Sequence, residues 1–286
     1  CNYAFMLLFS IITVYPFINI LALSLNEGID SSLGGITIWP RQFTLENYRI
    51  ALSYPAIESA LFISVSRTVL GTIYHLALVT LFAFAMSKKD LLFRKTITMI
   101  VLFAVYTNPG MIPNYINMVK VLHLAPNNFL VYILPGVFSL YNYAIIRTAI
   151  ENVPLSLEES AMMDGAGYVR IFFTITLPLV VPTLAALALF CAVGAWNDWM
   201  TSMLYFSKKH LWSLQYVLQQ ILQESSQREI LSFQQLTEQE ERAKETFTPT
   251  SIQNAILMIT TIPIICVYPF VQRYFTKGVL VGSVKE

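Results

Sequence analysis

One stretch of the sequence combines acidic side chains, glycines and helix-start signals between two long apolar runs. It reads PLSLEESAMMDGAGYVRIFFTITLPLVVP and covers residues 154–182. Pro154 and Ser156 favour the start of a helix, and Ser156 with Glu159 has the S-x-x-E form of a capping box. Gly165 predicts the end of that helix, because glycine adopts the left-handed turn that closes many helices. A second amphipathic stretch, YVRIFFTITLP, follows, so we expect a helix-turn-helix.

The residue types in this stretch favour docking rather than catalysis. Glu158, Glu159 and Asp164 stand beside methionine and leucine, a combination that suits a protein partner with an apolar groove and a basic contact. A helix lying flat on lipid is the alternative. Three acids in one short segment are unfavourable at an anionic membrane surface, so the sequence favours the protein partner.

The composition indicates a membrane protein. Hydrophobic residues make up 56% of the 286 residues, charged residues only 12%, and the mean hydropathy is +0.59. In soluble domains about a quarter of the residues are charged. A helix of roughly 20 apolar residues crosses the hydrocarbon core of a bilayer. We therefore predict an all-α integral membrane protein with six transmembrane helices, at about 4–25, 58–86, 97–118, 128–149, 179–205 and 252–273.

Lysine and arginine in the loops predict the orientation of these spans, because such residues accumulate on the cytoplasmic side. The connection 87–96 is rich in them, and the tail 274–286 carries Lys277 and Lys285. We therefore expect both termini and the stretch 150–178 in the cytoplasm. The segments 26–57 and 206–251 then face outward.

The outward segment 206–251 contains one helical signal. Its apolar residues from Ser213 to Gln223 fall on a single helical stripe. The residues of the stripe are Leu214, Val217, Leu218, Ile221 and Leu222. The glutamine-rich stretch that follows, with both signs of charge, is typical of a solvated loop.

Polar and aromatic residues inside the predicted spans are candidates for a solute path. Asn197 and Asp198, in the sequence GAWNDWM, should face the interior of the helix bundle or a water-filled route. Trp196 and Trp199 could stack on sugar rings, pack in the core or belong to an interfacial aromatic belt. Further candidates of the same kind are Tyr106, Asn108, Asn114, Tyr141 and Asn142.

Other functions find little support in the sequence. The net charge of +1 gives no reason to expect nucleic acid as a partner, and three widely separated cysteines suggest neither a disulfide framework nor a metal site. His75 could serve an intramembrane enzyme, but a hydrogen-bonded structural histidine is the simpler interpretation, and we expect no catalytic residue. The sequence lacks the G-x-x-x-x-G-K-[ST] pattern of an ATP-binding loop, so any nucleotide would bind another chain.

The stretch 154–182 also resembles a family signature. It is similar to the E-A-A, G and I-x-L-P motif in permease subunits of bacterial ABC importers, with Ser160 in place of the middle alanine. The matching residues are Glu159, Ala161, Gly165, Ile175, Leu177 and Pro178. The likeness extends over nearly the whole chain, through FTLENYRIAL, WNDW and YPFVQRYFTKGVLVGSVKE. It is strongest to the smaller permease subunits of maltose-type carbohydrate importers that serve oligosaccharides and polysaccharide fragments.

This resemblance implies a type I ABC importer permease fold in a bacterial cytoplasmic (inner) membrane. The helix-turn-helix would be a coupling helix in a cleft of an ATPase, with Glu159 meeting a basic residue there and Gly165 forming the turn. The coupling residues would be Glu158, Glu159, Ala161, Asp164, Gly165, Ala166, Ile175, Leu177 and Pro178. The implied partners are a second permease subunit, two ATPase subunits that bind ATP and Mg, an extracytoplasmic solute-binding protein, an oligosaccharide and membrane lipid.

The resemblance also implies roles for two other segments. The tail would contact the two ATPases through Lys277, Gly278 and Lys285, and we expect Gly278 and Gly282 to break any long helix there. The loop 223–245 would reach into the solute-binding protein. An oligomer that contains uronic acid fits within the expected cargo. A permease for a non-sugar solute is the nearest alternative, and broken helices such as TNPGMIP keep a secondary transporter open.

Overall fold

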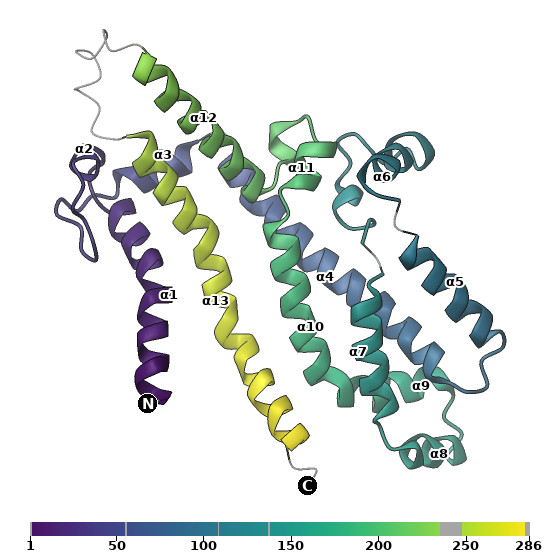
Figure 1. Ribbon diagram of the computed structural model, residues 1–286. Helices are drawn as coiled ribbons and strands as arrows, with labels where there is room; N and C mark the ends of the chain where they lie inside the picture. Colours follow the sequence, from purple (N-terminus) through teal and green to yellow (C-terminus); the bar gives the residue numbers. More distant parts are fainter. Residues whose placement is uncertain (1, 55, 108, 137, 235–247, 284–286) are drawn as a thin grey trace. The chain divides into compact units, whose positions relative to one another are not determined.

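The computed structural model describes residues 2–54, 56–107, 109–136, 138–234 and 248–283. Over these residues the chain is helical apart from its connecting loops and one isolated bridge between Asn26 and Phe43, in agreement with the all-α prediction (Figure 1). The chain divides into two compact units. Unit 1 comprises Cys1–Ile63 and Lys209–Cys266, and unit 2 comprises Ser64–Lys208 and Val267–Glu286.

Unit 1 begins with the apolar helix α1 (Asn2–Ser24), followed by the short helices α2 (Gly28–Ser32) and α3 (Glu46–Ser53). A buried asparagine joins α3 to the end of α1. Asn47 Nδ2 donates hydrogen bonds to the carbonyl oxygens of Ser24, at 3.0 Å, and Asn26, at 2.7 Å. Asn47 belongs to the FTLENYRIAL segment. Its side chain therefore has a structural role, because it holds the start of α3 against the end of α1.

The loop between α2 and α3 is held by hydrogen bonds to Asp30. Its carboxylate accepts from Asn26 Nδ2 at 2.8 Å and from Arg41 Nε at 3.1 Å. Nearby, the hydroxyl groups of Tyr48 and Ser24 lie 2.8 Å apart. Burial raises the pKa of Tyr48, and its hydrogen bond to Ser24 partly opposes that rise. The segment predicted to face outward is thus an ordered cap on α1.

The predicted stripe in segment 206–251 is confirmed. A turn of 3₁₀ helix, η4 (Lys209–Leu211), precedes α12 (Leu214–Gln234), and the stripe residues Leu214, Val217, Leu218 and Ile221 are buried. After residues 235–247, which lie outside the described chain, helix α13 (Pro249–Ser283) begins. Reciprocal hydrogen bonds between Thr248 and Ser251, at 3.1 and 3.2 Å, cap its start.

The prediction that Gly278 and Gly282 break the final helix is wrong. Helix α13 continues through both glycines to Ser283, well beyond the expected end of the last span at about 273. Glycine inside a helix costs only about 1 kcal/mol relative to alanine, which is too little to stop a helix that already runs for many turns. The tail is therefore an extension of the last long helix rather than a separate irregular segment.

Unit 2 is built around three helices: most of α4 (Ile57–Ser87), α7 (Leu140–Glu151) and α10 (Leu177–Asn197). They share one hydrophobic cluster with the short helix α9 (Tyr168–Ile171) and the π-helical turn η3 (Phe172–Thr176). Its buried residues are Val79, Ala83, Phe84, Met86, Tyr143, Ile146, Ile150, Ile171, Phe172, Val180 and Leu187. In Figure 1, α8 (Leu155–Met163) lies at one end of this unit, and α6 (Met111–Ile116) and α11 (Met200–Tyr205) lie at the other.

Four helical stretches in the described chain are long and apolar enough to cross a membrane. They are Asn2–Ser24, Ile57–Ser87, Tyr168–Asn197 and Thr250–Val267. A fifth crossing is present if the bent pair Arg94–Tyr106 (α5) and Met111–Val121 (α6 with the π-helical turn η1, Asn117–Val121) counts as one span. The two halves meet at 109°, where Gly110 adopts a φ of +83° within TNPGMIP. This bend agrees with the broken helix that TNPGMIP indicates in the sequence.

The predicted span 128–149 is divided. A 3₁₀ turn, η2 (Phe129–Tyr132), is separated from α7 by a loop in which Gly136 has a φ of +99°. Pro135 and Gly136 end the first piece, because proline cannot donate to the helix and glycine permits the left-handed turn. By length and hydropathy, the described helices therefore give four or five spans rather than the six predicted.

Candidate functional site

The predicted helix at the start of the motif stretch is α8, but its cap differs from the prediction. The N-cap residue is Pro154, whose φ of −57° and ψ of 125° direct the chain into the helix, and no side chain caps it. Leu157 N–H donates to the carbonyl of Pro154 at 3.1 Å. Ser156 lies inside the first turn, so the predicted capping box with Glu159 is wrong.

The predicted turn at the end of α8 is confirmed. Gly165 has a φ of +81°, and its N–H donates to the carbonyl of Met162 at 3.0 Å. Ala166 N–H reaches back to the carbonyl of Ala161 at 2.9 Å. These two bonds form a Schellman motif, in which the left-handed residue is usually glycine. Gly165 thereby sets the angle at which the chain leaves α8.

The chain then runs without a break from α9 through η3 into α10. The π-helical turn ends at Thr176, just before the Leu177–Pro178 step. Pro178 has no N–H for the carbonyl of Thr174 and its ring crowds that carbonyl, a known cause of local widening. The candidate crossing therefore starts at Tyr168, about one helical segment earlier than the predicted span 179–205. The Gly165 turn is therefore connected to α10 through continuous helix.

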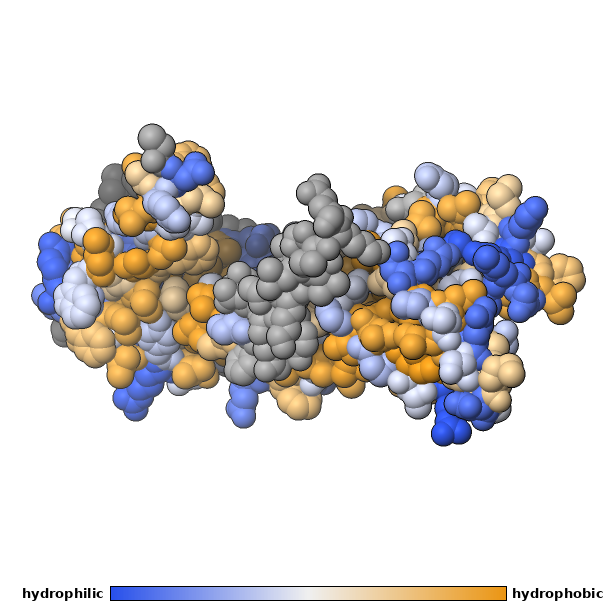
Figure 2. All heavy atoms as spheres, turned by 90° about the horizontal axis from the view of Figure 1, so that it is seen from below, coloured by the Kyte–Doolittle hydropathy of each residue, from blue (hydrophilic) through white to orange (hydrophobic). Residues whose placement is uncertain are grey.

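The motif residues divide between two faces. Glu159, Asp164 and Gly165 are exposed, and so are the apolar side chains of Leu155 (62%) and Met163 (89%). Figure 2, which views the end of unit 2 that carries α8, shows hydrophilic side chains gathered there beside hydrophobic surface. The inward group comprises Ala161, Ala166 and Leu177, which pack against the hydrophobic cluster, together with buried Glu158 and half-buried Ile175; Pro178 is exposed.

Glu158 and Glu159 therefore have different environments despite being adjacent. The Glu158 carboxylate accepts a hydrogen bond from Lys88 Nζ, which follows the last turn of α4. The Glu159 side chain is open to solvent. Successive residues on a helix differ by about 100° in direction, because the helix has 3.6 residues per turn. Only Glu159 of this pair is presented outward.

Asp198 in the WNDW sequence forms an ion pair inside unit 2. Its carboxylate lies 2.5 Å from Nη2 of Arg67 on α4, and Arg67 Nη1 donates to the Asp198 carbonyl at 2.9 Å. The guanidinium also lies over the ring of Tyr132, 4.3 Å from its centroid. A buried arginine within an apolar helix needs such a counter-charge. The structure thus gives Asp198 a structural partner, and its place on the solute path stays a prediction.

His75 is the hub of a second polar cluster. Its Nδ1 donates to the carbonyl of Gly136 at 2.8 Å, and its Nε2 accepts from Asn142 Nδ2 at 2.8 Å. Asn142 also donates to Cys191 Sγ at 3.3 Å. The cluster links α4, α7 and α10 through the imidazole of His75 and the amide of Asn142. This arrangement agrees with the structural interpretation of His75 and gives Asn142, which is buried, a structural role as well.

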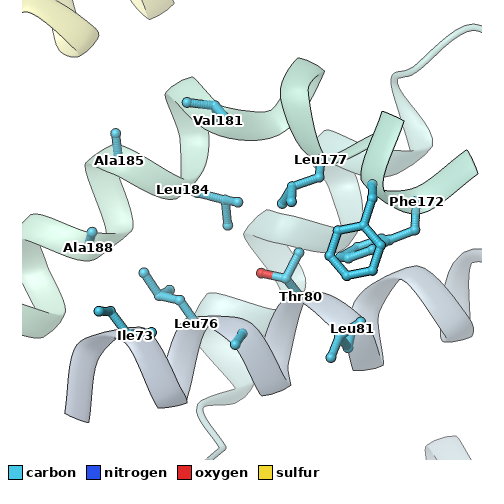
Figure 3. Close-up of a pocket in the computed structure, with 12 residues that line it drawn as sticks. Ile73, Leu76, Thr80, Leu81, Phe172, Leu177, Val181, Leu184, Ala185 and Ala188 are labelled. Carbon is cyan, nitrogen blue, oxygen red and sulfur yellow. The ribbon is translucent and has the colours of Figure 1, made fainter. Parts of the chain in front are cut away.

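A pocket of about 500 Å³ lies between α4, η3 and α10 (Figure 3). Eleven of its twelve lining residues are apolar, and Thr80 is the exception among them. Leu177 of the I-x-L-P motif points into it. A pocket with almost no polar groups suits hydrocarbon and not a solute rich in hydroxyl groups. It is therefore separate from the candidate solute path.

Comparison with known protein families identifies the family of the chain. Residues 2–281 match the family described as the inner membrane component of binding-protein-dependent transport systems. The chain belongs to this family. It is thus a permease component of a transport system that works with a separate binding protein.

Two relatives of the permease are similar over their whole lengths. The polygalacturonan/rhamnogalacturonan transport system permease protein YtcP of Bacillus subtilis (strain 168) is 36% identical, with 99% of this chain and 96% of the relative covered. Protein LplC of the same organism is 35% identical, with 100% and 94% covered. In a crystal structure of a bacterial ABC transporter involved in import of the acidic polysaccharide alginate, one chain is 27% identical, with a TM-score of 0.84 over 96% of this chain and 95% of that one.

The candidate solute-path residues of the permease differ in how far they are exposed. Trp196 and Asn142 are buried, and Asp198 and Trp199 are half-buried. Asn108 lies outside the described residues. The exposed candidates are Tyr106, Asn114, Tyr141 and Asn197. Among the residues that the structure describes, no group of three or more His, Cys, Asp or Glu side chains could hold a metal ion.

Two residues that matter in this arrangement were missed from the sequence. Arg67 was not singled out, although an arginine inside an apolar run is itself a signal that an acidic partner must lie nearby. Lys88 belongs to the basic connection 87–96, whose composition predicts only the orientation of the spans. Its pairing with Glu158, 70 residues away, could not be deduced from local pattern.

Proposed function

We propose that this permease is a subunit of an ATP-driven importer that moves oligosaccharides or polysaccharide fragments from a solute-binding protein into the cytoplasm. The observation that carries the proposal is the exposed face of α8, where the Glu159 carboxylate stands beside the apolar side chains of Met162 and Met163. An exposed apolar face of this kind marks contact with a protein or with lipid, and the acids Glu159 and Asp164 on it are unfavourable at an anionic lipid surface. The partner that we propose is a cytoplasmic ATPase.

The chemistry of this face suits a groove with a basic rim. Methionine side chains adapt their shape to an apolar groove, and an exposed glutamate can pair with arginine or lysine of the partner. The Schellman turn at Gly165 fixes where α8 ends and α9 begins. Closure of the two ATPase subunits around ATP would displace α8 and, through α9 and η3, tilt α10. ATP and Mg are proposed to bind to the ATPase subunits and not to this chain.

The proposed membrane arrangement has six spans with both termini in the cytoplasm. The four long helices and the bent α5–α6 pair supply five of them. The sixth would be the broken element that combines η2 and α7, since interrupted helices are tolerated where neighbours satisfy the backbone. A second, homologous permease subunit would complete the path, with Tyr106, Asn114, Tyr141 and Asn197 as its candidates on this chain.

Two segments complete the proposal. The end of α13, with Lys277 and Gly278, and Lys285, which lies outside the described residues, would contact the ATPases. The segment 223–245 would reach into the solute-binding protein; its first part, up to Gln234, is the end of α12, and residues 235–245 lie outside the described residues.

The proposed cargo is an oligosaccharide that contains uronic acid. Its support is the similarity to a permease named for polygalacturonan and rhamnogalacturonan transport and to a transporter involved in alginate import. Uptake of radiolabelled oligogalacturonides, alginate oligomers and neutral maltooligosaccharides by cells with and without the permease gene tests it. Uptake of the uronate oligomers alone should depend on the permease. Dependence restricted to maltooligosaccharides, or to no sugar, would reject the uronate cargo.

The coupling role is tested with Glu159→Lys in the assembled transporter. The variant should stay in the membrane, lose co-purification of the ATPase and lower uptake by about tenfold or more, because a repelled charge at an interface costs over a kcal/mol. Asp90→Lys makes the same charge change at another exposed acid, in the loop that follows α4, and should behave like the wild type. Full ATPase binding and uptake in Glu159→Lys would exclude the coupling role. Uptake by vesicles that contain no ATPase would instead favour a secondary transporter.

A further inference from the structure

A charged pair joins α8 to the end of α4. Lys88 directly follows α4, and its Nζ donates a hydrogen bond to Oε2 of Glu158. The side chain of Lys88 is 17% exposed and that of Glu158 is 9% exposed, so both charges are largely withdrawn from water. A buried pair of this kind is sensitive to the loss of either partner, because the remaining charge stays buried without compensation.

Aromatic rings from two elements enclose the ammonium group. Lys88 Nζ lies 4.2 Å from the ring centroid of Phe84 on α4 and 5.9 Å from that of Tyr168 on α9. Cation–π attraction strengthens when the cation is shielded from water. The ammonium group of Lys88 therefore contacts Phe84 of α4, Glu158 of α8 and Tyr168 of α9.

The neighbouring charged groups leave this pair intact. Glu151, at the end of α7, pairs with Arg147 at 2.8 Å and with Arg94 at 3.8 Å. Glu159 and Asp164 on the helix-turn-helix are exposed to solvent. The surface around the joint is thus organised so that Lys88 faces Glu158 and not these other acids.

Helix α4 continues from this joint to two further polar cross-links. His75 is hydrogen-bonded to Asn142 of α7, and Arg67 is paired with Asp198 at the end of α10. Rigid helices with discrete polar contacts are the elements that carry displacement across a protein. A shift of the Lys88 end of α4 therefore acts on α7 and on the break between α10 and α11.

We propose that the Lys88–Glu158 pair is a joint through which displacement of α8 reaches α4. The inference rests on the proposed function, in which an ATPase moves α8. The covalent chain leads from α8 through α9 and η3 to α10, and the ion pair adds a second route to α4. Lys88 and Glu158 are positioning residues in this mechanism, and Glu159, not Glu158, faces the ATPase.

The test compares Lys88→Met, Glu158→Gln and the charge-swapped double variant Lys88→Glu/Glu158→Lys. Each is purified with its partner permease and ATPases and reconstituted in vesicles with the solute-binding protein. The readouts are co-purified ATPase, ATP hydrolysis and uptake of radiolabelled oligogalacturonide. Both single variants should retain the ATPase but move at least about tenfold less sugar per ATP hydrolysed, a loss of a little over one kcal/mol of coupling. The double variant should recover at least about half of the wild-type ratio, because the pair is re-formed.

Two results would overturn the joint. One is a wild-type ratio of sugar to ATP in both single variants, which would leave the pair a purely structural contact. The other is loss of ATPase co-purification in Glu158→Gln, which would make Glu158 a direct contact. Neither result depends on Glu159, whose replacement tests the proposed function itself. If the ATPase binds Glu159→Lys normally while the pair variants lose coupling, the contact at Glu159 is wrong, and the joint stands with the ATPase acting on another part of α8.

A charge-preserving variant keeps the test decisive if the single variants fail to assemble. Glu158→Asp retains the carboxylate but shortens the side chain by one methylene group, which draws it away from Lys88. Its assembly should be normal and its ratio of uptake to ATP hydrolysis reduced. An unchanged ratio in a stable Glu158→Asp transporter would count against a joint that depends on the geometry of the pair.

Discussion

Arg67 and Asp198, which stand 131 residues apart in the sequence, form an ion pair that joins α4 to the break between α10 and α11. The Arg67 side chain is only 4% exposed. The other carboxylate oxygen of Asp198 accepts the backbone N–H of Thr201 at 3.1 Å, at the start of α11. One carboxylate therefore neutralises a buried guanidinium and also directs the chain into the next helix. This double role gives the acid within WNDW a structural reason, and its contact with solute stays a prediction.

Arg67→Met should destabilise the permease by about 1–3 kcal/mol, because the half-buried Asp198 carboxylate loses the hydrogen bond from the guanidinium. The expected observations are a lower melting temperature of the purified complex and less protein in the membrane. Arg67→Met/Asp198→Asn removes both charges and should recover part of the loss. If Arg67→Met melts like the wild type, the pair does not hold the α10–α11 break.

Asn142→Leu should cost about 1–3 kcal/mol of stability, because His75 and Cys191 lose a hydrogen-bond donor at a buried position. The variant replaces the amide with an apolar group of similar size. Melting of the purified complex measures the stability, and the KM for uptake measures solute contact. We expect the stability to fall and the KM to stay constant. A raised KM with unchanged melting would restore Asn142 to the solute path.

The parts of the motif stretch that depend on local chemistry were predictable. Gly165 ends α8 because only a residue that tolerates positive φ can close a Schellman turn, and that requirement is visible in the sequence. The kink at TNPGMIP follows from proline and glycine in the same way. The capping box was not realised, since Pro154 started the helix two residues before the serine could cap it.

The parts that depend on distant partners were not predictable. Glu158 and Glu159 look equivalent in the sequence, and only the fold shows that one faces Lys88 and the other faces solvent. Asp198 has the pattern of a solute-path residue, because an intramembrane acid is a functional candidate until its partner is known. Its partner Arg67 lies on another helix, so the pair could not be deduced from the local sequence.

Gly165→Ala should weaken coupling, because a side chain at a φ of +81° costs about 1–2 kcal/mol. No atom lies within 4 Å of the position that the new Cβ would occupy, so the effect comes from the backbone and not from a clash. Gly165→Asn is the matched control, since asparagine tolerates the left-handed region better. We expect uptake to fall more in the alanine variant than in the asparagine variant. Equal uptake in both would show that the conformation of the turn does not matter.

Tyr141 and Trp196 provide the last contrast, between an exposed aromatic side chain and a buried one. Tyr141 is 69% exposed and Trp196 is 6% exposed, although both were candidates for the solute path. Trp196→Ala should lower stability by about 3–5 kcal/mol through loss of buried surface, seen as reduced melting temperature and abundance. Tyr141→Ala should leave melting unchanged but raise the KM for oligosaccharide uptake by roughly three- to tenfold if its ring stacks on the sugar. If Tyr141→Ala alters neither quantity, the solute path runs along other residues, with Tyr106 and Asn197 as the next positions to replace.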